Sequence, residues 1–154
     1  MLEGFWYIAG ESAAVKAGQP LASVLCNQPL VLFRDSRGRI HALEDRCPHK
    51  GVPLSSARQE GDSLRCPFHG WRFISSGECV EVPSLGTAPH PSSASACVRT
   101  FPAEERDGWV WVYIGHDRCP KPSCPPPSLP VPADGSRMVS VRESAQAKVR
   151  WDFA

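Results

Sequence analysis

The chain alternates between short runs of apolar residues and turn-forming stretches rich in Gly, Pro, Asn, Asp and Ser. Apolar runs of this length, bounded by such residues, are typical of β-strands. The strands predicted in this way are Leu21–Cys26, Leu30–Arg34, Arg39–Glu44, Ser63–Arg65, Trp71–Ile74, Cys79–Val82, Val98–Phe101 and Trp109–Ile114. Many short strands with frequent turns predict a mainly β fold, a small antiparallel sandwich or barrel.

Polar segments between these strands predict how the strands pair. Asn27-Gln28-Pro29 separates the first two strands, and Ser75–Glu78 closes a later hairpin. We expect Val98–Phe101 and Trp109–Ile114 to form the last pair, across Glu104–Gly108.

Several conspicuous side chains have a structural interpretation. The segment Trp109–Tyr113 alternates bulky residues along one strand, which is more typical of a core than of a stacking surface for a substrate. The charged residues near one hairpin are interpreted as a solvated surface: Asp35, Arg37, Glu44, Asp45 and Arg46. Three histidines have no partner at ligand spacing and are interpreted as ordinary surface or core residues: His41, His90 and His116.

Length and charge exclude several classes of function. The 154 residues are sized for one domain. The net charge is +1 and the Lys and Arg residues are dispersed, so no nucleic-acid partner is expected. The longest apolar run, Trp109–Ile114, is too short to span a membrane. Residues 1–4 do not have the basic start of a secretory signal, so we expect none.

Two short segments carry the chemistry: Cys47-Pro48-His49-Lys50-Gly51 and Cys66-Pro67-Phe68-His69-Gly70-Trp71. We expect both to project from the β fold as hairpin tips. Each places one cysteine and one histidine close together, in the order C-x-H and then C-x-x-H, with sixteen residues between His49 and Cys66. Two thiolates and two imidazoles form the mixed ligand set of a Rieske [2Fe–2S] centre, in which two cysteines bind one iron and two histidines bind the other.

A single zinc ion is the alternative interpretation of these four residues. Structural zinc sites usually space each ligand pair by two to four residues, whereas one residue separates Cys47 from His49. The flanking residues favour close-fitting loops, because a proline follows each cysteine and stiffens the backbone. Gly51 and Gly70 follow the histidines, where the backbone must approach the cluster closely or adopt a positive φ.

The remaining cysteines do not form a disulfide framework. Seven cysteines are present, and five remain besides Cys47 and Cys66: Cys26, Cys79, Cys97, Cys119 and Cys124. Five cannot all pair, and a secreted framework usually has an even set. A reducing compartment is therefore expected. We interpret this as a cytoplasmic protein, with an organelle left open.

The stretch from Trp6 to Ile114, which contains these two segments, resembles the N-terminal Rieske domain of the Rieske non-haem iron oxygenases, the ring-hydroxylating and demethylating family. The resemblance is carried by "FWYIAG", "PLVLFRDSRGRIHALEDRCPHKGVPLS", "LRCPFHGWRF" and "GWVWVYIG". It implies a Rieske-type antiparallel β fold with two cluster-binding loops. It also implies that Cys47 and Cys66 bind one iron of a [2Fe–2S] cluster and that His49 and His69 bind the other.

The respiratory branch of Rieske proteins carries two further cysteines, joined by a disulfide, and a serine that hydrogen-bonds a cluster sulfur. Val52, Phe68 and Trp71 stand at the corresponding positions here. The loss of this electron-withdrawing support predicts a reduction potential of roughly −150 mV rather than +300 mV.

The C-terminal part predicts a domain boundary. Residues 119–132 hold seven of the sixteen prolines, which is typical of an extended linker. We expect a Rieske domain at 1–118, a Pro-rich linker at 119–135 and, at 136–154, the start of a truncated catalytic-type domain. The family's catalytic domain holds a mononuclear iron on two histidines and one carboxylate. No histidine follows His116, so this chain alone cannot supply that site.

Three functions follow. The first is the electron-transfer domain of an oxygenase-type oxidoreductase, which accepts electrons from a reductase or ferredoxin and passes them to a mononuclear iron site absent from this chain. The second is a stand-alone Rieske ferredoxin-like carrier, although such carriers usually end near the last strand. The third is a structural zinc module. The substrate and the oligomeric state do not follow from the sequence.

Overall fold

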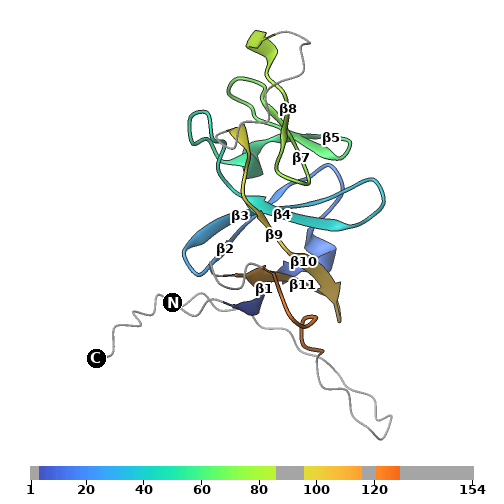
Figure 1. Ribbon diagram of the computed structural model, residues 1–154. Helices are drawn as coiled ribbons and strands as arrows, with labels where there is room; N and C mark the ends of the chain where they lie inside the picture. The colour runs from blue at the N-terminus through green and yellow to red at the C-terminus, as the bar shows by residue number, and fades with distance from the viewer. Residues whose placement is uncertain (1–3, 86–95, 116–120, 129–154) are drawn as a thin grey trace, which may run out of the picture.

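The computed structural model describes residues 4–85, 96–115 and 121–128, and these form three stacked antiparallel sheets (Figure 1). The first sheet has the order β1 (Phe5–Glu11), β11 (Trp109–Ile114), β10 (Ala103–Arg106). The middle sheet has the order β2 (Leu21–Leu25), β3 (Gln28–Arg34), β4 (Ile40–Glu44), β9 (Thr100–Phe101). The third has the order β5 (Arg58–Glu60), β6 (Ser63–Arg65), β7 (Arg72–Ile74), β8 (Cys79–Glu81).

Three single-turn 3-10 helices interrupt the strands: η1 (Ser12–Ala14), η2 (Leu54–Ser56) and η3 (Pro83–Leu85). Within the described residues no helix is long and apolar enough to cross a membrane. The predicted mainly β, antiparallel fold is confirmed.

Strand β3 lies at the centre of the molecule and separates two hydrophobic cores. Val31 and Phe33 belong to the core shared with the third sheet, whereas Leu30 and Leu32 belong to the core shared with the first sheet. Side chains alternate between the two faces of a strand, so a continuous apolar run indicates burial on both faces. All four side chains are fully buried, and burial of each contributes about 1.5–3 kcal/mol to folding.

The first sheet differs from the predicted pairing. Trp109–Ile114 forms β11 as expected, but its hairpin partner is β10, with Arg106 opposite Trp109. The predicted partner contributes only Thr100–Phe101, which pairs with β4. The interpretation of Trp109–Tyr113 as a core strand is confirmed, since Val110 and Val112 are fully buried.

The first hairpin turns earlier than predicted. Gln28 and Pro29 belong to β3, and the turn consists of Cys26 and Asn27 alone. Both residues have positive φ, 52° and 58°, as a two-residue turn matched to the strand twist requires. Asn adopts this conformation readily, so the turn signal lay in Cys26-Asn27 rather than in Gln28-Pro29.

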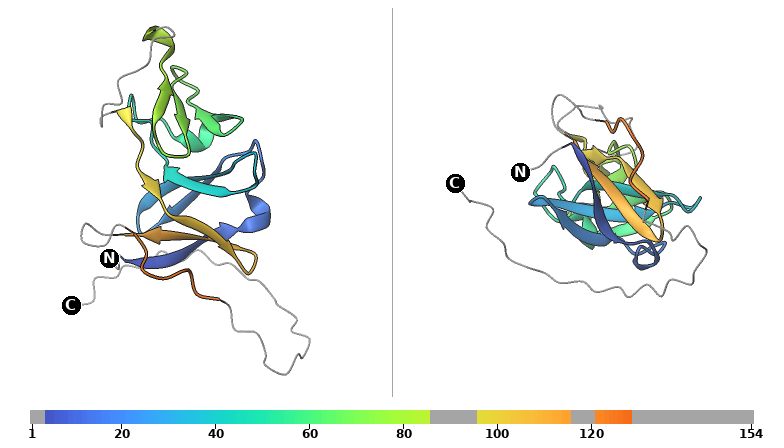
Figure 2. Two further views of the ribbon diagram at one scale, coloured as in Figure 1. Left: turned by 45° about the vertical axis from the view of Figure 1, so that its right-hand side comes forward. Right: turned by 90° about the horizontal axis from the view of Figure 1, so that it is seen from below.

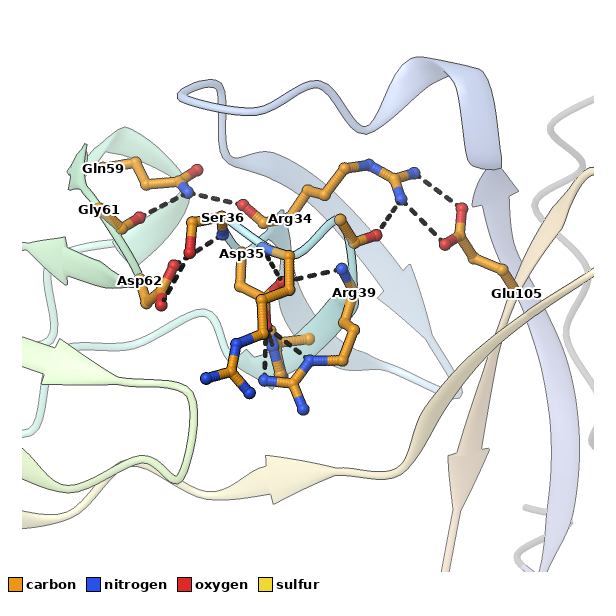
Figure 3. A network of polar contacts seen from close by, with 11 residues as sticks. Arg34, Asp35, Ser36, Arg39, Gln59, Gly61, Asp62 and Glu105 are labelled. Carbon is orange, nitrogen blue, oxygen red and sulfur yellow. Dashed lines mark hydrogen bonds and ion pairs between the residues drawn. The ribbon is translucent and has the colours of Figure 1, made fainter.

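The interpretation of the charged residues near the β3–β4 turn as a solvated surface holds for Arg37 and Arg46, which are exposed, but it is wrong for Asp35. Asp35 is only 3% exposed and is surrounded by donors (Figure 3). Its Oδ1 accepts from the backbone N–H groups of Arg37 and Arg39, at 2.9 and 2.8 Å, and its Oδ2 accepts from Arg39 Nε at 2.8 Å. His41 Nε2 lies 2.9 Å from the same Oδ2. The contact with His41, followed by those with Arg39 and Arg37, holds the pKa of Asp35 well below its usual range.

The surrounding polar contacts join the three sheets (Figure 3). Arg34, at the end of β3, forms a two-pronged ion pair with Glu105 of β10, with N–O distances of 2.7 and 2.9 Å. On the other side, Gln59 of β5 donates to the Arg34 carbonyl at 2.7 Å. Asp62 accepts from the backbone N–H of Ser36 at 2.7 Å. These contacts fix the β3–β4 turn between the first and third sheets.

Part of the predicted Pro-rich linker lies along the first sheet (Figure 2). The indole N–H of Trp6 donates to the carbonyl of Cys124 at 2.8 Å, and the guanidinium of Arg106 donates to the carbonyl of Pro126. The Pro126 side chain is fully buried. Residues 121–128 therefore pack against β1 and β10, and the predicted segment 136–154 lies outside the described residues.

Candidate metal centre

The first predicted ligand segment folds into a tight loop, the first Cys-Pro loop (residues 47–52). The Gly51 N–H donates to the Cys47 carbonyl at 2.8 Å, and the Cys47 N–H donates to the Val52 carbonyl at 2.8 Å. This loop lies on the crossover from β4 to β5, which belong to different sheets. It is therefore not the hairpin tip that the strand pattern predicted.

The second Cys-Pro loop (residues 66–71) has the same inner hydrogen bonds. The Gly70 N–H donates to the Cys66 carbonyl at 3.0 Å, and the Cys66 N–H donates to the Trp71 carbonyl at 2.8 Å. This loop connects β6 and β7, which pair with each other, so the predicted hairpin tip is confirmed here.

Both loops need glycine at the same position. Gly51 and Gly70 each lie four residues after a cysteine, and their φ values are 72° and 73°. This left-handed conformation costs other L-residues roughly 1–2 kcal/mol. The prediction of a positive φ at these two glycines is confirmed.

The two loops bring Cys47 and Cys66 together. Both are 2% exposed, and their thiols lie within hydrogen-bonding reach of each other as free thiols. Burial raises the pKa of Cys47 to about 11, and the neighbouring Cys66 thiol acts in the same direction. The backbone N–H groups of His49 and Lys50 lie close to the Cys47 sulfur and oppose that rise in the pKa. Such donors are suited to a sulfur that carries negative charge when a metal replaces its proton.

The two predicted histidine ligands also meet. The ring centroids of His49 and His69 are 4.6 Å apart. His49 is half-buried, and its ring stacks on Trp71 at 4.8 Å with an interplanar angle of 4°. Burial, followed by repulsion from His69 and Lys50, lowers the pKa of His49. The neutral imidazole, which is the form that binds a metal, is thereby favoured.

These four donors form two pairs rather than one group. The thiols of Cys47 and Cys66 form a buried pair, whereas the imidazoles of His49 and His69 form a second pair nearer the surface. In the described part of the chain, no three His, Cys, Asp or Glu side chains surround a common point where one metal ion could bind. A thiol pair and an imidazole pair fit two adjacent irons better than a single zinc.

Different side chains support the two loops from outside. The carboxylate of Asp45 accepts from the backbone N–H and the hydroxyl of Ser55, at 2.6 and 2.7 Å, and so closes the base of the first loop. Arg65 supports the second loop, because its Nη1 donates to the Gly70 carbonyl at 3.0 Å.

Sequence reasoning did not identify Asp45, Ser55 or Arg65 as parts of this site, and it did not predict that Trp71 stacks on His49. A signal for Arg65 was available, since "Arg-Cys-Pro" occurs twice, at Arg46 and Arg65, once before each loop. Two described residues that were assigned no metal role have structural surroundings: His41 contacts Asp35, and Cys79 is buried in the core that also contains Cys47 and Cys66. His90, His116 and Cys119 are outside the described residues.

Comparison with known proteins agrees with this geometry. Residues 5–102 match the Rieske [2Fe-2S] domain, and the chain belongs to that family. An iron–sulfur subunit of the toluene-4-sulfonate monooxygenase system of Comamonas testosteroni is 40% identical over 110 residues, which cover 71% of this chain and 30% of the relative. The oxygenase subunit of 3-chlorobenzoate-3,4-dioxygenase from the same species is 37% identical over 116 residues, which cover 75% of this chain and 27% of the relative.

The fold is also similar to that of a solved oxygenase. The crystal structure of apo dicamba monooxygenase superposes with a TM-score of 0.73 at 34% identity, covering 82% of this chain and 38% of that one. The chain thus contains a Rieske [2Fe-2S] domain, and it spans about a third of the length of these relatives.

Proposed function

We propose that Cys47 and Cys66 bind one iron of the [2Fe–2S] cluster and that His49 and His69 bind the other. The observation that carries this assignment is the separation of the four donors into a buried thiol pair and an outer imidazole pair. A bound cluster supplies reversible one-electron chemistry. The chain contributes the buried thiols, the N–H groups of His49 and Lys50 close to the Cys47 sulfur, and two imidazoles near the surface, where a redox partner can approach.

We further propose that the domain serves an oxygenase. It accepts electrons from a reductase or ferredoxin and delivers them to a mononuclear iron site that is not part of this chain. The relatives support this proposal, because their names describe iron–sulfur or oxygenase subunits. In this proposal residues 1–118 are the Rieske domain, 119–135 the linker and 136–154 the start of the next domain. The six cysteine thiols of the described residues fit a reducing compartment, which we propose is the cytoplasm.

An EPR spectrum of the anaerobically purified, dithionite-reduced protein, with iron and zinc contents, tests the assignment. A reduced [2Fe–2S] signal with the low average g of histidine ligation, and about two irons per chain, supports it. A colourless, EPR-silent protein that contains zinc contradicts it. Cys97→Ser is the matched control for substitutions of Cys47 and Cys66, because Cys97 is an exposed cysteine outside both Cys-Pro loops and its loss should leave the signal unchanged.

A further inference from the structure

We propose that Arg65 is a positioning residue that holds the second Cys-Pro loop in its cluster-binding conformation. This inference rests on the proposed function, because it assigns Arg65 a role toward the cluster that this loop binds. The starting observation is the contact between Arg65 Nη1 and the Gly70 carbonyl, at 3.0 Å. Gly70 directly follows His69, so this contact fixes the peptide next to one proposed ligand.

Two carboxylates fix the direction of the Arg65 guanidinium. Its Nε donates to Glu60 at 2.8 Å, and its Nη1 and Nη2 donate to the two oxygens of Glu81, at 2.9 and 3.1 Å. Arginine stays charged in proteins, so the contacts with Glu81 and Glu60 are ion pairs. A planar guanidinium can contact three acceptors in fixed directions, whereas a lysine ammonium is a single point charge.

The acceptors come from different strands of the third sheet. Arg65 lies on β6, Glu60 on β5 and Glu81 on β8, while the Gly70 carbonyl lies in the β6–β7 loop. Arg58, Arg65 and Arg72 face one another across β5, β6 and β7, and like charges in that position destabilise a sheet. The two glutamates offset this repulsion and leave the Arg65 guanidinium aimed at the loop.

The first loop provides an internal comparison. Arg46 also precedes a cysteine of a Cys-Pro loop, and its Nε is 3.5 Å from the position that a Cβ on Gly51 would occupy. Arg46 is exposed, and its guanidinium has no ion-pair partner among the described residues. Arg46 therefore stands at the same place in the sequence, directly before a ligand cysteine, but it lacks the carboxylates that would orient its guanidinium.

The experiment compares Arg65→Gln with the matched control Arg46→Gln in the full chain, since both remove one positive charge next to a ligand cysteine. Loss of the cluster is measured as the decay of visible absorbance after a chelator is added. Each variant is measured at the same number of degrees below its own Tm, so that differences in global stability do not affect the comparison. We expect about tenfold or faster loss in Arg65→Gln and a wild-type rate in Arg46→Gln. We expect the EPR g values to change only in Arg65→Gln.

Equal rates in the two variants, or a lower Tm in Arg65→Gln with an unchanged rate and EPR spectrum, would overturn the proposal. Arg65→Lys should restore the rate only in part, and full restoration would also overturn it. If Arg65→Gln does not fold, the double variant Glu60→Gln/Glu81→Gln keeps Arg65 but removes the groups that orient it. Faster cluster loss in that variant supports the proposal, and an unchanged rate contradicts it. Absence of a cluster from the wild-type protein would instead refute the proposed function.

Discussion

The two Cys-Pro loops have the same inner frame but different outer supports. Both place a cysteine, a proline and a positive-φ glycine at the same spacing, with the same two backbone hydrogen bonds. The first loop crosses between two sheets and is closed at its base by Asp45 and Ser55. The second closes a hairpin and is held near its end by Arg65.

This difference separates two requirements of a binuclear site. The inner frame brings each cysteine and histidine into reach of a metal, and it depends on residues within six positions of each other. The outer supports set how firmly each loop is held, and they depend on contacts between distant residues. The predictions below test this distinction, from the largest expected effect to the smallest.

Removal of one thiol should have the largest effect, and it should be equal in the two loops. We expect Cys47→Ser and Cys66→Ser each to abolish cluster assembly and much of the stability gained from it, because metal binding is coupled to folding. Iron content and the EPR signal measure assembly, and thermal unfolding measures stability. Retention of a normal signal by either variant would show that its thiol is not a ligand.

Alanine at the two glycines should distinguish the loops. A Cβ on Gly70 would lie 3.0 Å from Pro83 Cγ, whereas a Cβ on Gly51 would meet only the flexible Arg46 side chain, at 3.5 Å. Both variants carry the penalty of a positive φ, about 1–2 kcal/mol. Crowding against Pro83 should bring the cost of Gly70→Ala to about 3 kcal/mol. Urea unfolding measures the difference, and equal losses would count against distinct packing of the two loops.

Asp35 provides a reference outside both loops. We expect Asp35→Asn to lower the Tm by several degrees at neutral pH, because it weakens the contacts of a buried carboxylate that hold the β3–β4 turn together. The EPR signal of the remaining folded protein should be unchanged. This variant therefore separates loss of global stability from loss of loop support.

The same variant gives a pH dependence with a defined sign. The pKa of Asp35 is depressed in the folded protein, so its stabilisation is complete above the usual carboxyl pKa, about pH 4, and is lost as the pH falls further. The stability advantage of the wild type over Asp35→Asn should be constant near neutral pH and shrink in acid. Urea titrations at several pH values measure it, and a difference that grew in acid would be inconsistent with this assignment.

The smallest effect is expected at the base of the first loop. Asp45→Asn keeps the shape of the side chain but weakens the hydrogen bonds from the N–H and hydroxyl of Ser55, and we expect a loss of about 1–2 kcal/mol. Cluster loss should accelerate less than in Arg65→Gln. A larger acceleration would reverse the comparison and make Asp45 the more important support.

How much of the structure can be predicted from the sequence depends on how far apart in the sequence the contacting residues lie. Cys47, His49, Cys66 and His69 could be predicted as ligands because each cysteine–histidine pair lies within four residues, so the spacing is visible in the sequence. The partners of Arg65 and Asp45 were not identified, because Glu81 is sixteen residues from Arg65 and Ser55 is ten residues from Asp45. Only the folded sheet brings these groups together.

The strands that were not predicted share a similar cause. β5 and β10 consist mostly of charged residues and have no apolar run, because they are edge strands of their sheets. β1 contains apolar residues, but its register shifts between Ile8 and Gly10, which interrupts the alternation. Asp35 was misinterpreted because its donors are local backbone groups whose direction the sequence does not show.

The central position of β3 determines how the domain opens. This strand is paired on both edges, by β2 and β4, and both of its faces are covered by a hydrophobic core. Its amide protons can therefore exchange with deuterium only when the two cores separate together. The slowest exchange rates in the domain should be found at Val31 and Leu32, and they would report the free energy of global rather than local opening. The Cys-Pro loops would then share one cooperative unit with the sheet at the opposite end of the molecule.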